Sequence, residues 1–209
     1  MIDNLIDSLI ADAVELKPAP HPFTLSLQWL GVAAIYLALS FALFGQRPDL
    51  AAQFHQPWFT AEIAALLCIL VATSLSAALL VFPDLHQLRG FAFAPLAAFV
   101  LLIVVLFFAW QADTPPALLP VHSFECTISI ALFSLLPAGG MFFVMHHFAS
   151  THYRWAGSVA LLFAFSVGAL WLRLFEVNNS IVHVIEWHYL PMLAIGVTGM
   201  WLGKKILKW

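Results

Sequence analysis

The chain has 209 residues, of which 63% are hydrophobic and 9% are charged, and its mean hydropathy is +0.95. Soluble proteins average roughly 45–50% apolar and about 25% charged residues, so these values exclude a soluble globular domain. A net charge of -3 excludes an electrostatic nucleic-acid binder, and two cysteines are too few for a disulfide framework. The composition indicates a polytopic membrane protein.

Residues 1–20 contain the first predicted element, an amphipathic helix in front of the first membrane span. Apolar residues recur there at helical spacing, and acidic residues occupy the other faces. Anionic lipid would repel the acidic faces, so the apolar stripe suits a groove on a protein partner; packing against its own bundle is the alternative. The stripe consists of Ile2, Leu5, Ile6, Leu9 and Ile10. The segment lacks the basic start and continuous apolar core of a signal peptide.

The rest of the chain, residues 21–209, is predicted to form one transmembrane domain with an all-α fold. A spanning helix needs about 20 apolar residues, and helices are the default in lipid because the backbone must satisfy its own polar groups. Pro137 and Pro191 fall inside the fourth and sixth spans and predict kinks there. The six predicted spans cover residues 24–44, 59–81, 91–110, 127–148, 156–175 and 185–203.

The distribution of lysine and arginine predicts the orientation of the bundle. Six spans place both termini on one side, and the opposite side holds only Arg47 and Arg173. The side of the termini holds Lys17, Arg89, Arg154, Lys204, Lys205 and Lys208. Because short basic loops stay in the cytoplasm, we expect both termini to be cytoplasmic, with Arg47 and Arg173 at the outer face.

Potential metal ligands gather at the predicted outer ends of spans four and six. His122 and Cys126 are four residues apart, and His183 and Glu186 are three apart, so each pair shares a helix face; His188 follows. Imidazole, thiolate and carboxylate groups bind transition metals, and Cys126, His122 and His183 are the candidate metal ligands. The alternative is that these groups bond to loops, water and headgroups. No resident cofactor is predicted, only a metal as a signal ligand.

Cys126 is alternatively interpreted as a redox-reactive thiol. It opens span four, where helix-terminal N–H groups favour a thiolate, although Glu125 opposes this. Cys68 lies in the middle of span two and is interpreted as an inert apolar residue.

Arg47, Asp49 and Glu62 are predicted to form a structural clasp at the outer face. Glu62 lies about one turn inside span two, where a carboxylate needs a partner, and Arg47 is the expected one. Arg173 is expected to extend outward from span five toward the interface.

The sequence contains no sign of an enzyme. No paired carboxylates or Ser/His/Asp set occur inside a span, and no glycine-rich phosphate loop is present. The residues alone therefore indicate a membrane protein with an amphipathic tail and an outer polar cluster.

The order of several short motifs resembles the NrsF-type family of membrane anti-sigma factors. One motif follows the first span, one leads into the fourth span, one lies within the fourth, one lies within the sixth, and one closes the chain. They are residues 44–50 (FGQRPDL), 122–126 (HSFEC), 134–137 (SLLP), 187–188 (WH) and 203–209 (GKKILKW).

The resemblance implies a protein of the bacterial inner membrane that regulates transcription. Its cytoplasmic N-terminal region would sequester an extracytoplasmic-function (ECF) sigma factor and release it on an envelope signal such as redox or metal stress. Some relatives carry a second cysteine between spans five and six, but here residues 175–180 have none. Cys126 with nearby histidines, or an intermolecular disulfide, would have to replace a thiol pair. A small-solute transporter or channel is the alternative function, followed by a membrane enzyme.

Overall fold

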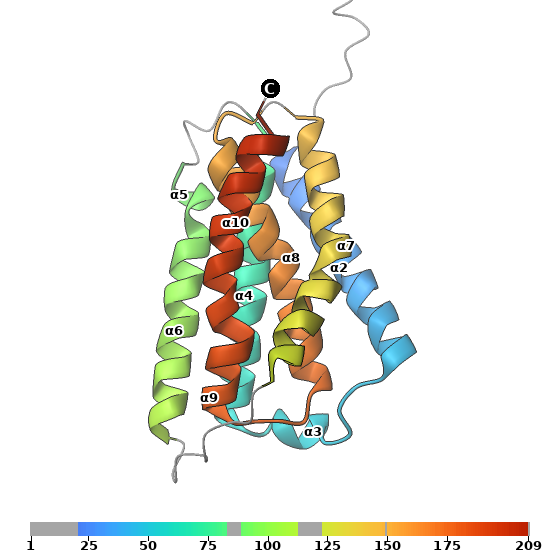
Figure 1. Ribbon diagram of the computed structural model, residues 1–209, viewed down its shortest axis with the longest axis vertical. Coiled ribbons are helices and arrows are strands. Elements are labelled where there is room, and N and C mark those ends of the chain that lie inside the picture. The colour runs from blue at the N-terminus through green and yellow to red at the C-terminus, as the bar shows by residue number, and fades with distance from the viewer. Residues whose placement is uncertain (1–20, 83–88, 113–122, 149, 209) are drawn as a thin grey trace, which may run out of the picture.

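A computed structural model describes residues 21–82, 89–112, 123–148 and 150–208 of the chain (Figure 1). All regular structure in these ranges is helical, and six helices are long and apolar enough to cross a membrane, which confirms the predicted all-α fold with six spans. The predicted amphipathic helix, with Ile2, Leu5, Ile6, Leu9 and Ile10, lies outside the described residues, as does His122.

The six spans begin and end within a few residues of the predicted limits. The first five are α2 (Pro22–Phe44), α4 (Pro57–Leu80), α6 (Ala94–Ala112), α7 (Phe124–His146) and α8 (Tyr153–Phe175). The sixth is continuous and comprises α9 (Ile181–His183), the π-helix η1 (Val184–Tyr189) and α10 (Leu190–Ile206). Two short helices, α3 (Leu50–Gln53) and α5 (Arg89–Ala92), connect spans.

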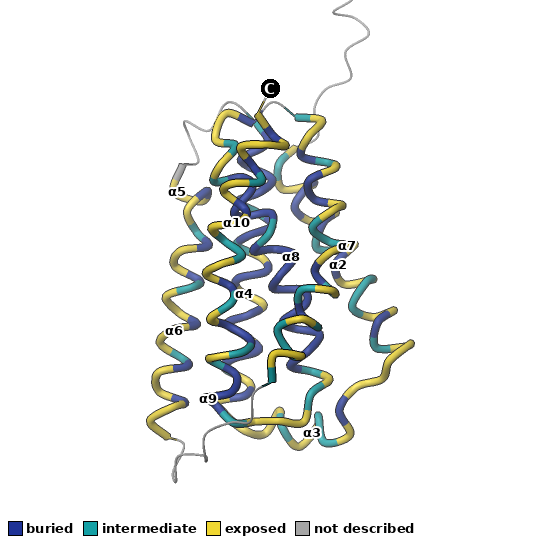
Figure 2. Tube along the Cα trace, viewed as in Figure 1, coloured by how far each residue is buried: buried dark blue, intermediate teal, exposed yellow. Residues whose placement is uncertain are grey.

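Helix α8 is the centre of the bundle and packs against α4, α7 and α10. Most of α8 and much of α4 is buried, whereas the other spans are exposed along much of their length (Figure 2). These other spans expose large apolar side chains. Such surfaces suit a lipid environment, because apolar side chains contact lipid tails more favourably than water.

Glycines allow the backbones of α8 and α10 to touch. A Cβ atom added to Gly157 of α8 would lie 2.5 Å from the Cα of Gly203, and one added to Gly199 would lie 2.5 Å from the carbonyl oxygen of Gly157. Gly199 and Gly203 have the Gly-x-x-x-Gly spacing that brings membrane helices together.

Pro137 and Pro191 each free a carbonyl group, and a neighbouring helix binds it. Pro137 cannot donate to the carbonyl of Phe133, which instead accepts a 3.0 Å hydrogen bond from the Tyr36 hydroxyl of α2. Pro191 likewise frees the carbonyl of Trp187, which accepts a 2.6 Å bond from Thr127. These bonds tie α7 to α2 and the sixth span to α7.

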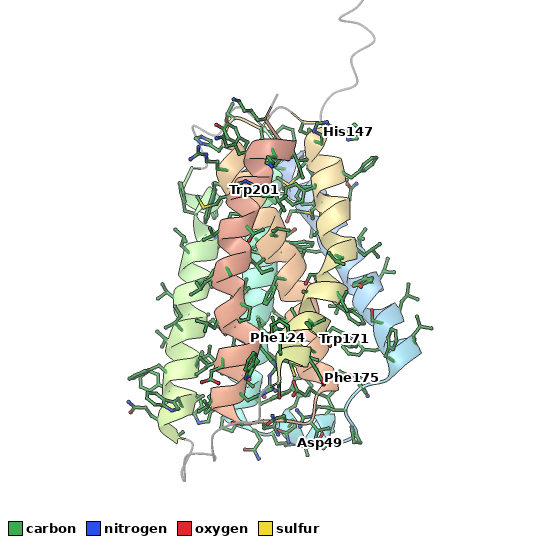
Figure 3. All side chains as sticks on the ribbon, in the orientation of Figure 1. Asp49, Phe124, His147, Trp171, Phe175 and Trp201 are labelled. Carbon is green, nitrogen blue, oxygen red and sulfur yellow. The ribbon has the colours of Figure 1, made fainter. Side chains whose placement is uncertain are left out.

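Different elements of the chain lie at the two ends of the bundle. One end, here called the α3 end, carries α3, the segment between α8 and α9, and the start of α7 (Figure 1). The chain reaches it through Gly45, whose φ of 81° suits glycine and which ends α2. The other, the C-terminal end, carries the end of α10. Asp49 and Phe175 lie toward the α3 end, and His147 and Trp201 toward the C-terminal end (Figure 3).

Candidate functional site

Besides Arg47 and its partners, polar side chains at the α3 end form two groups in the described part of the chain. The first, here called the histidine–carboxylate cluster, consists of Cys126, Glu176, His183 and His188. The second, here called the ion-pair network, consists of Glu62, Arg173 and Tyr189.

The histidine–carboxylate cluster draws on three parts of the chain. Cys126 lies in the first turn of α7, Glu176 follows α8, and the histidines lie in the sixth span. Nε2 of His183 lies 3.1 Å from Oε1 of Glu176, and Nε2 of His188 lies 2.9 Å from Oε2. The Sγ of Cys126 donates to Oε1 of Glu176 at 3.5 Å. The cluster therefore joins spans four and six through the segment that follows span five.

A π-helical turn brings the two histidines together. Residues three or four apart share a face of an α-helix, whereas π-helical bonds run from i to i+5 and stack residues five apart. His183 and His188 have this separation; their ring centroids lie 5.2 Å apart and both are fully buried. The π turn ends two residues before Pro191, whose ring disfavours a regular α-helical turn before it.

The structure brings together only part of the predicted outer cluster. Cys126, His183 and His188 converge, whereas Glu186 is exposed and lies outside the converging group. Glu176 was missed, although it stands in the loop noted for its lack of a second cysteine. An acidic residue at the end of a span was the available signal.

The surroundings of Glu176 favour the ionised form of its carboxyl. Burial raises the pKa of Glu176, but the neighbouring His188 and His183 more than offset this, so its pKa lies below the ordinary value. Its side chain is 18% exposed, so the cluster reaches the surface of the α3 end.

The ion-pair network corrects two predictions. Arg173 does not extend outward: it is 3% exposed and binds Glu62 through two hydrogen bonds, of 2.7 and 2.8 Å. Glu62 therefore pairs with Arg173 and not with Arg47. The reason is the position of Arg173 on α8, the central helix, on the side that faces α4. The Tyr189 hydroxyl adds a 2.5 Å bond to Glu62.

Arg47 holds the loop between spans five and six. It is buried, and it donates to Asp49 at 2.7 and 2.9 Å, to Asn179 at 2.9 Å and to the carbonyl of Val177 at 3.2 Å. The bond from Arg47 lowers the pKa of Asp49 to about 2. Since Val177 directly follows Glu176, Arg47 helps to position the cluster. Arg47 and Asp49 of the predicted clasp are therefore paired with each other, without Glu62, and they fasten a loop.

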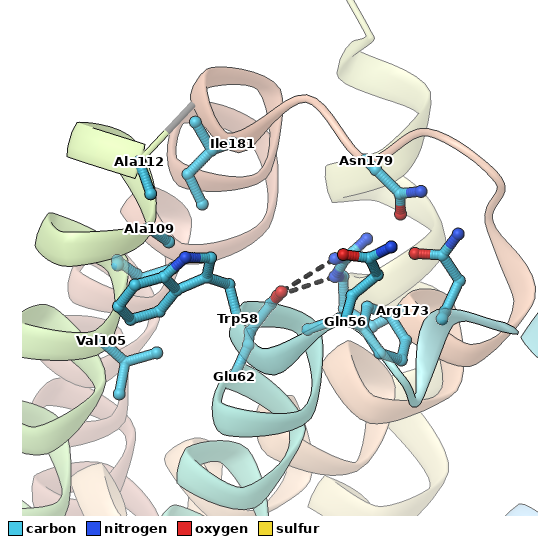
Figure 4. Close-up of a pocket in the computed structure, with 12 residues that line it drawn as sticks. Gln56, Trp58, Glu62, Val105, Ala109, Ala112, Arg173, Asn179 and Ile181 are labelled. Atoms are coloured by element: carbon cyan, nitrogen blue, oxygen red, sulfur yellow. Dashed lines mark hydrogen bonds and ion pairs between the residues drawn. The ribbon is translucent and has the colours of Figure 1, made fainter. Parts of the chain in front are cut away.

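A cavity of about 330 Å³ opens beside the ion-pair network (Figure 4). Trp58, Gln56 and Asn179 are among its lining residues, together with Glu62 and Arg173. Because these two charged groups bind each other, they offer no unpaired charge to a solute in the cavity.

Comparison with known proteins assigns the family. The sequence model of NrsF, described as negative regulator of sigma F, matches residues 9–209. The chain belongs to the NrsF family. It is 28% identical over 216 residues to the anti-sigma-F factor NrsF of Caulobacter vibrioides (strain NA1000 / CB15N), and the match covers 99% of both chains. No solved structure matches significantly. The resemblance seen in the short motifs is confirmed, and the protein is a negative regulator of a sigma factor.

Proposed function

We propose that this protein is an anti-sigma factor of the bacterial inner membrane, without catalytic activity of its own. It holds an ECF sigma factor through its cytoplasmic N-terminal region and releases it when a signal reaches the outer end of the bundle. The family match over residues 9–209 carries this proposal, and the six apolar helices support the membrane location.

The distribution of exposed cations supports an orientation with both termini in the cytoplasm. The lysine and arginine side chains that the structure describes as exposed lie at the C-terminal end: Arg154, Lys204, Lys205 and Lys208. At the α3 end, Arg47 and Arg173 are buried in ion pairs. Exposed positive charge favours the cytoplasmic side, so the α3 end faces outward in this proposal.

Thiol labelling tests the orientation. In a Cys68→Ser/Cys126→Ser background, cysteine at Lys17, Arg89, Arg154 or Lys208 should resist an impermeant maleimide in intact cells. His55→Cys, exposed at the α3 end, is the matched positive control and should react. Labelling of two or more of the four cytoplasmic positions would contradict the assigned orientation. Absence of labelling at His55→Cys would contradict it as well.

Docking of the sigma factor is assigned to the apolar stripe of residues 1–20. Leu5→Asp with Leu9→Asp should abolish co-purification of an overexpressed ECF sigma factor, because the double change places two charges on the docking face. Asn4→Asp with Ser8→Asp adds the same charges to the opposite face and should leave binding intact. If Leu5→Asp with Leu9→Asp retains binding as the control does, the docking site would instead be assigned to the loops around Arg89 and Arg154.

Signal transmission would use the histidine–carboxylate cluster. A ligand there holds the start of α7 against the sixth span, and both helices run to the C-terminal end. A ligand that prefers one packing of these helices by about 100-fold shifts the equilibrium by roughly 2.7 kcal/mol. Such a shift releases a partner that is held near balance.

A further inference from the structure

Four potential metal ligands at the α3 end point to one place. One ligand atom each from Cys126, Glu176, His183 and His188 lies within 4.8 Å of the other three. A tetrahedral zinc site with its usual bond lengths holds its ligand atoms roughly 3.3–3.8 Å apart. The short distances in the cluster, 2.9, 3.1 and 3.5 Å, fall close to this range. Small side-chain movements suffice to surround an ion.

The two histidines lack the hydrogen bonds that buried imidazoles normally make. Both are fully buried, and none of their four ring nitrogens is hydrogen-bonded within the described part of the chain. The Nε2 atoms approach the Glu176 carboxylate closely, but not in the direction of a hydrogen bond. Buried polar groups without partners are rare because water binds them better. A ligand placed between these atoms would satisfy them.

The donor set selects the class of ligand. Two imidazoles, a thiolate and a carboxylate are typical of zinc and neighbouring transition metals, and they do not suit Mg²⁺ or Ca²⁺. We propose that Cys126 Sγ, a carboxylate oxygen of Glu176 and the Nε2 atoms of His183 and His188 bind one divalent transition-metal ion of the zinc class. Four protein ligands fill a tetrahedral ion, so the site holds the helices together and leaves no open position for catalysis.

The charge of the four ligands and the partial exposure of the cluster also fit a divalent ion. Cys126 gives up its thiol proton to solvent on binding, so a thiolate and a carboxylate neutralise the two charges of the metal, which lowers the cost of burial. The partly exposed side chain of Glu176 provides a route from the α3 end. The metal would bind the start of α7, the segment after α8 and the π turn to one another.

Cobalt titration of the purified full-length chain in detergent tests the site. After removal of metal with a chelator, one equivalent of Co²⁺ should produce the visible bands of tetrahedral cobalt and a thiolate-to-cobalt charge-transfer band. One equivalent of Zn²⁺ should abolish both. Cys126→Ser should lose the charge-transfer band, and His188→Ala should weaken binding by at least about 100-fold, since even outer-shell changes cost 10–100-fold.

Matched controls use the same residue types outside the cluster. Glu186→Gln alters an exposed carboxylate in the same π turn, and Cys68→Ser removes the other thiol; both should bind Co²⁺ like the unaltered chain. The proposal fails if the unaltered chain binds no Co²⁺, if its cobalt spectrum lacks the thiolate band, or if Cys126→Ser keeps that band. The measurement needs no sigma factor, so its outcome is separate from that of the co-purification experiment.

Discussion

Arg173→Met is expected to lower the free energy of unfolding by about 3–5 kcal/mol, because it leaves the Glu62 carboxylate buried without its cation. Glu62 and Arg173 are 4% and 3% exposed, and two hydrogen bonds join them between α4 and α8. A surface ion pair would matter much less, since water solvates the remaining charge. Titration of the purified protein with a denaturing detergent, followed by circular dichroism or tryptophan fluorescence, measures the loss.

Removal of both charges should restore much of the lost stability. Glu62→Met with Arg173→Met replaces the pair by apolar side chains of similar length, a change that is often neutral in buried sites. The Tyr189 hydroxyl then lacks its acceptor, at a cost of about 1–3 kcal/mol, and adding Tyr189→Phe should remove that cost. Glu186→Gln is the control and should have a small effect, because it alters an exposed carboxylate and leaves no buried charge unpaired. A double variant that is no more stable than Arg173→Met would contradict the assignment.

Gly203→Val is expected to disrupt the contact between α8 and α10. A Cβ at Gly203 would collide with the carbonyl oxygen of Tyr153, and Gly157 lies directly across the interface. Overpacking usually costs about 1–3 kcal/mol, and backbone atoms cannot move aside as side chains do, so we expect a loss at or above the upper end. Because α10 ends where the proposed cytoplasmic face lies, repression of the sigma factor should fall as well.

Gly31→Val and Gly139→Val are the matched controls for the glycine contact. A Cβ at either position meets no atom within 4 Å, so the same substitution adds an apolar side chain without a collision. Both variants should unfold close to the detergent concentration of the unaltered chain. If they were as unstable as Gly203→Val, the effect would come from helix propensity or insertion rather than from the α8–α10 contact.

The sequence by itself determined the all-α fold and the positions of the six spans. Length and hydropathy are local properties, and in lipid the backbone must hydrogen-bond within the protein, so each long apolar stretch forms a helix. The same reasoning placed Cys126, His183 and His188 at one end of the bundle, because spans four and six both begin at the same membrane surface. The Gly-x-x-x-Gly spacing of Gly199 and Gly203 was also available, and it would have predicted a close helix contact.

Only the tertiary structure decided which polar groups meet. Whether Glu62 binds Arg47 or Arg173 depends on how α8 is rotated about its axis, and packing against several neighbours sets that rotation. The histidine–carboxylate cluster contains Glu176 and not Glu186. This depends on the π turn, which changes the spacing at which residues of the sixth span share a face. Pro191 leaves the carbonyl of Trp187 free, and the hydroxyl that binds this carbonyl comes from Thr127 in a different helix. Such pairings arise from relations between helices, which the local pattern of a single helix does not contain.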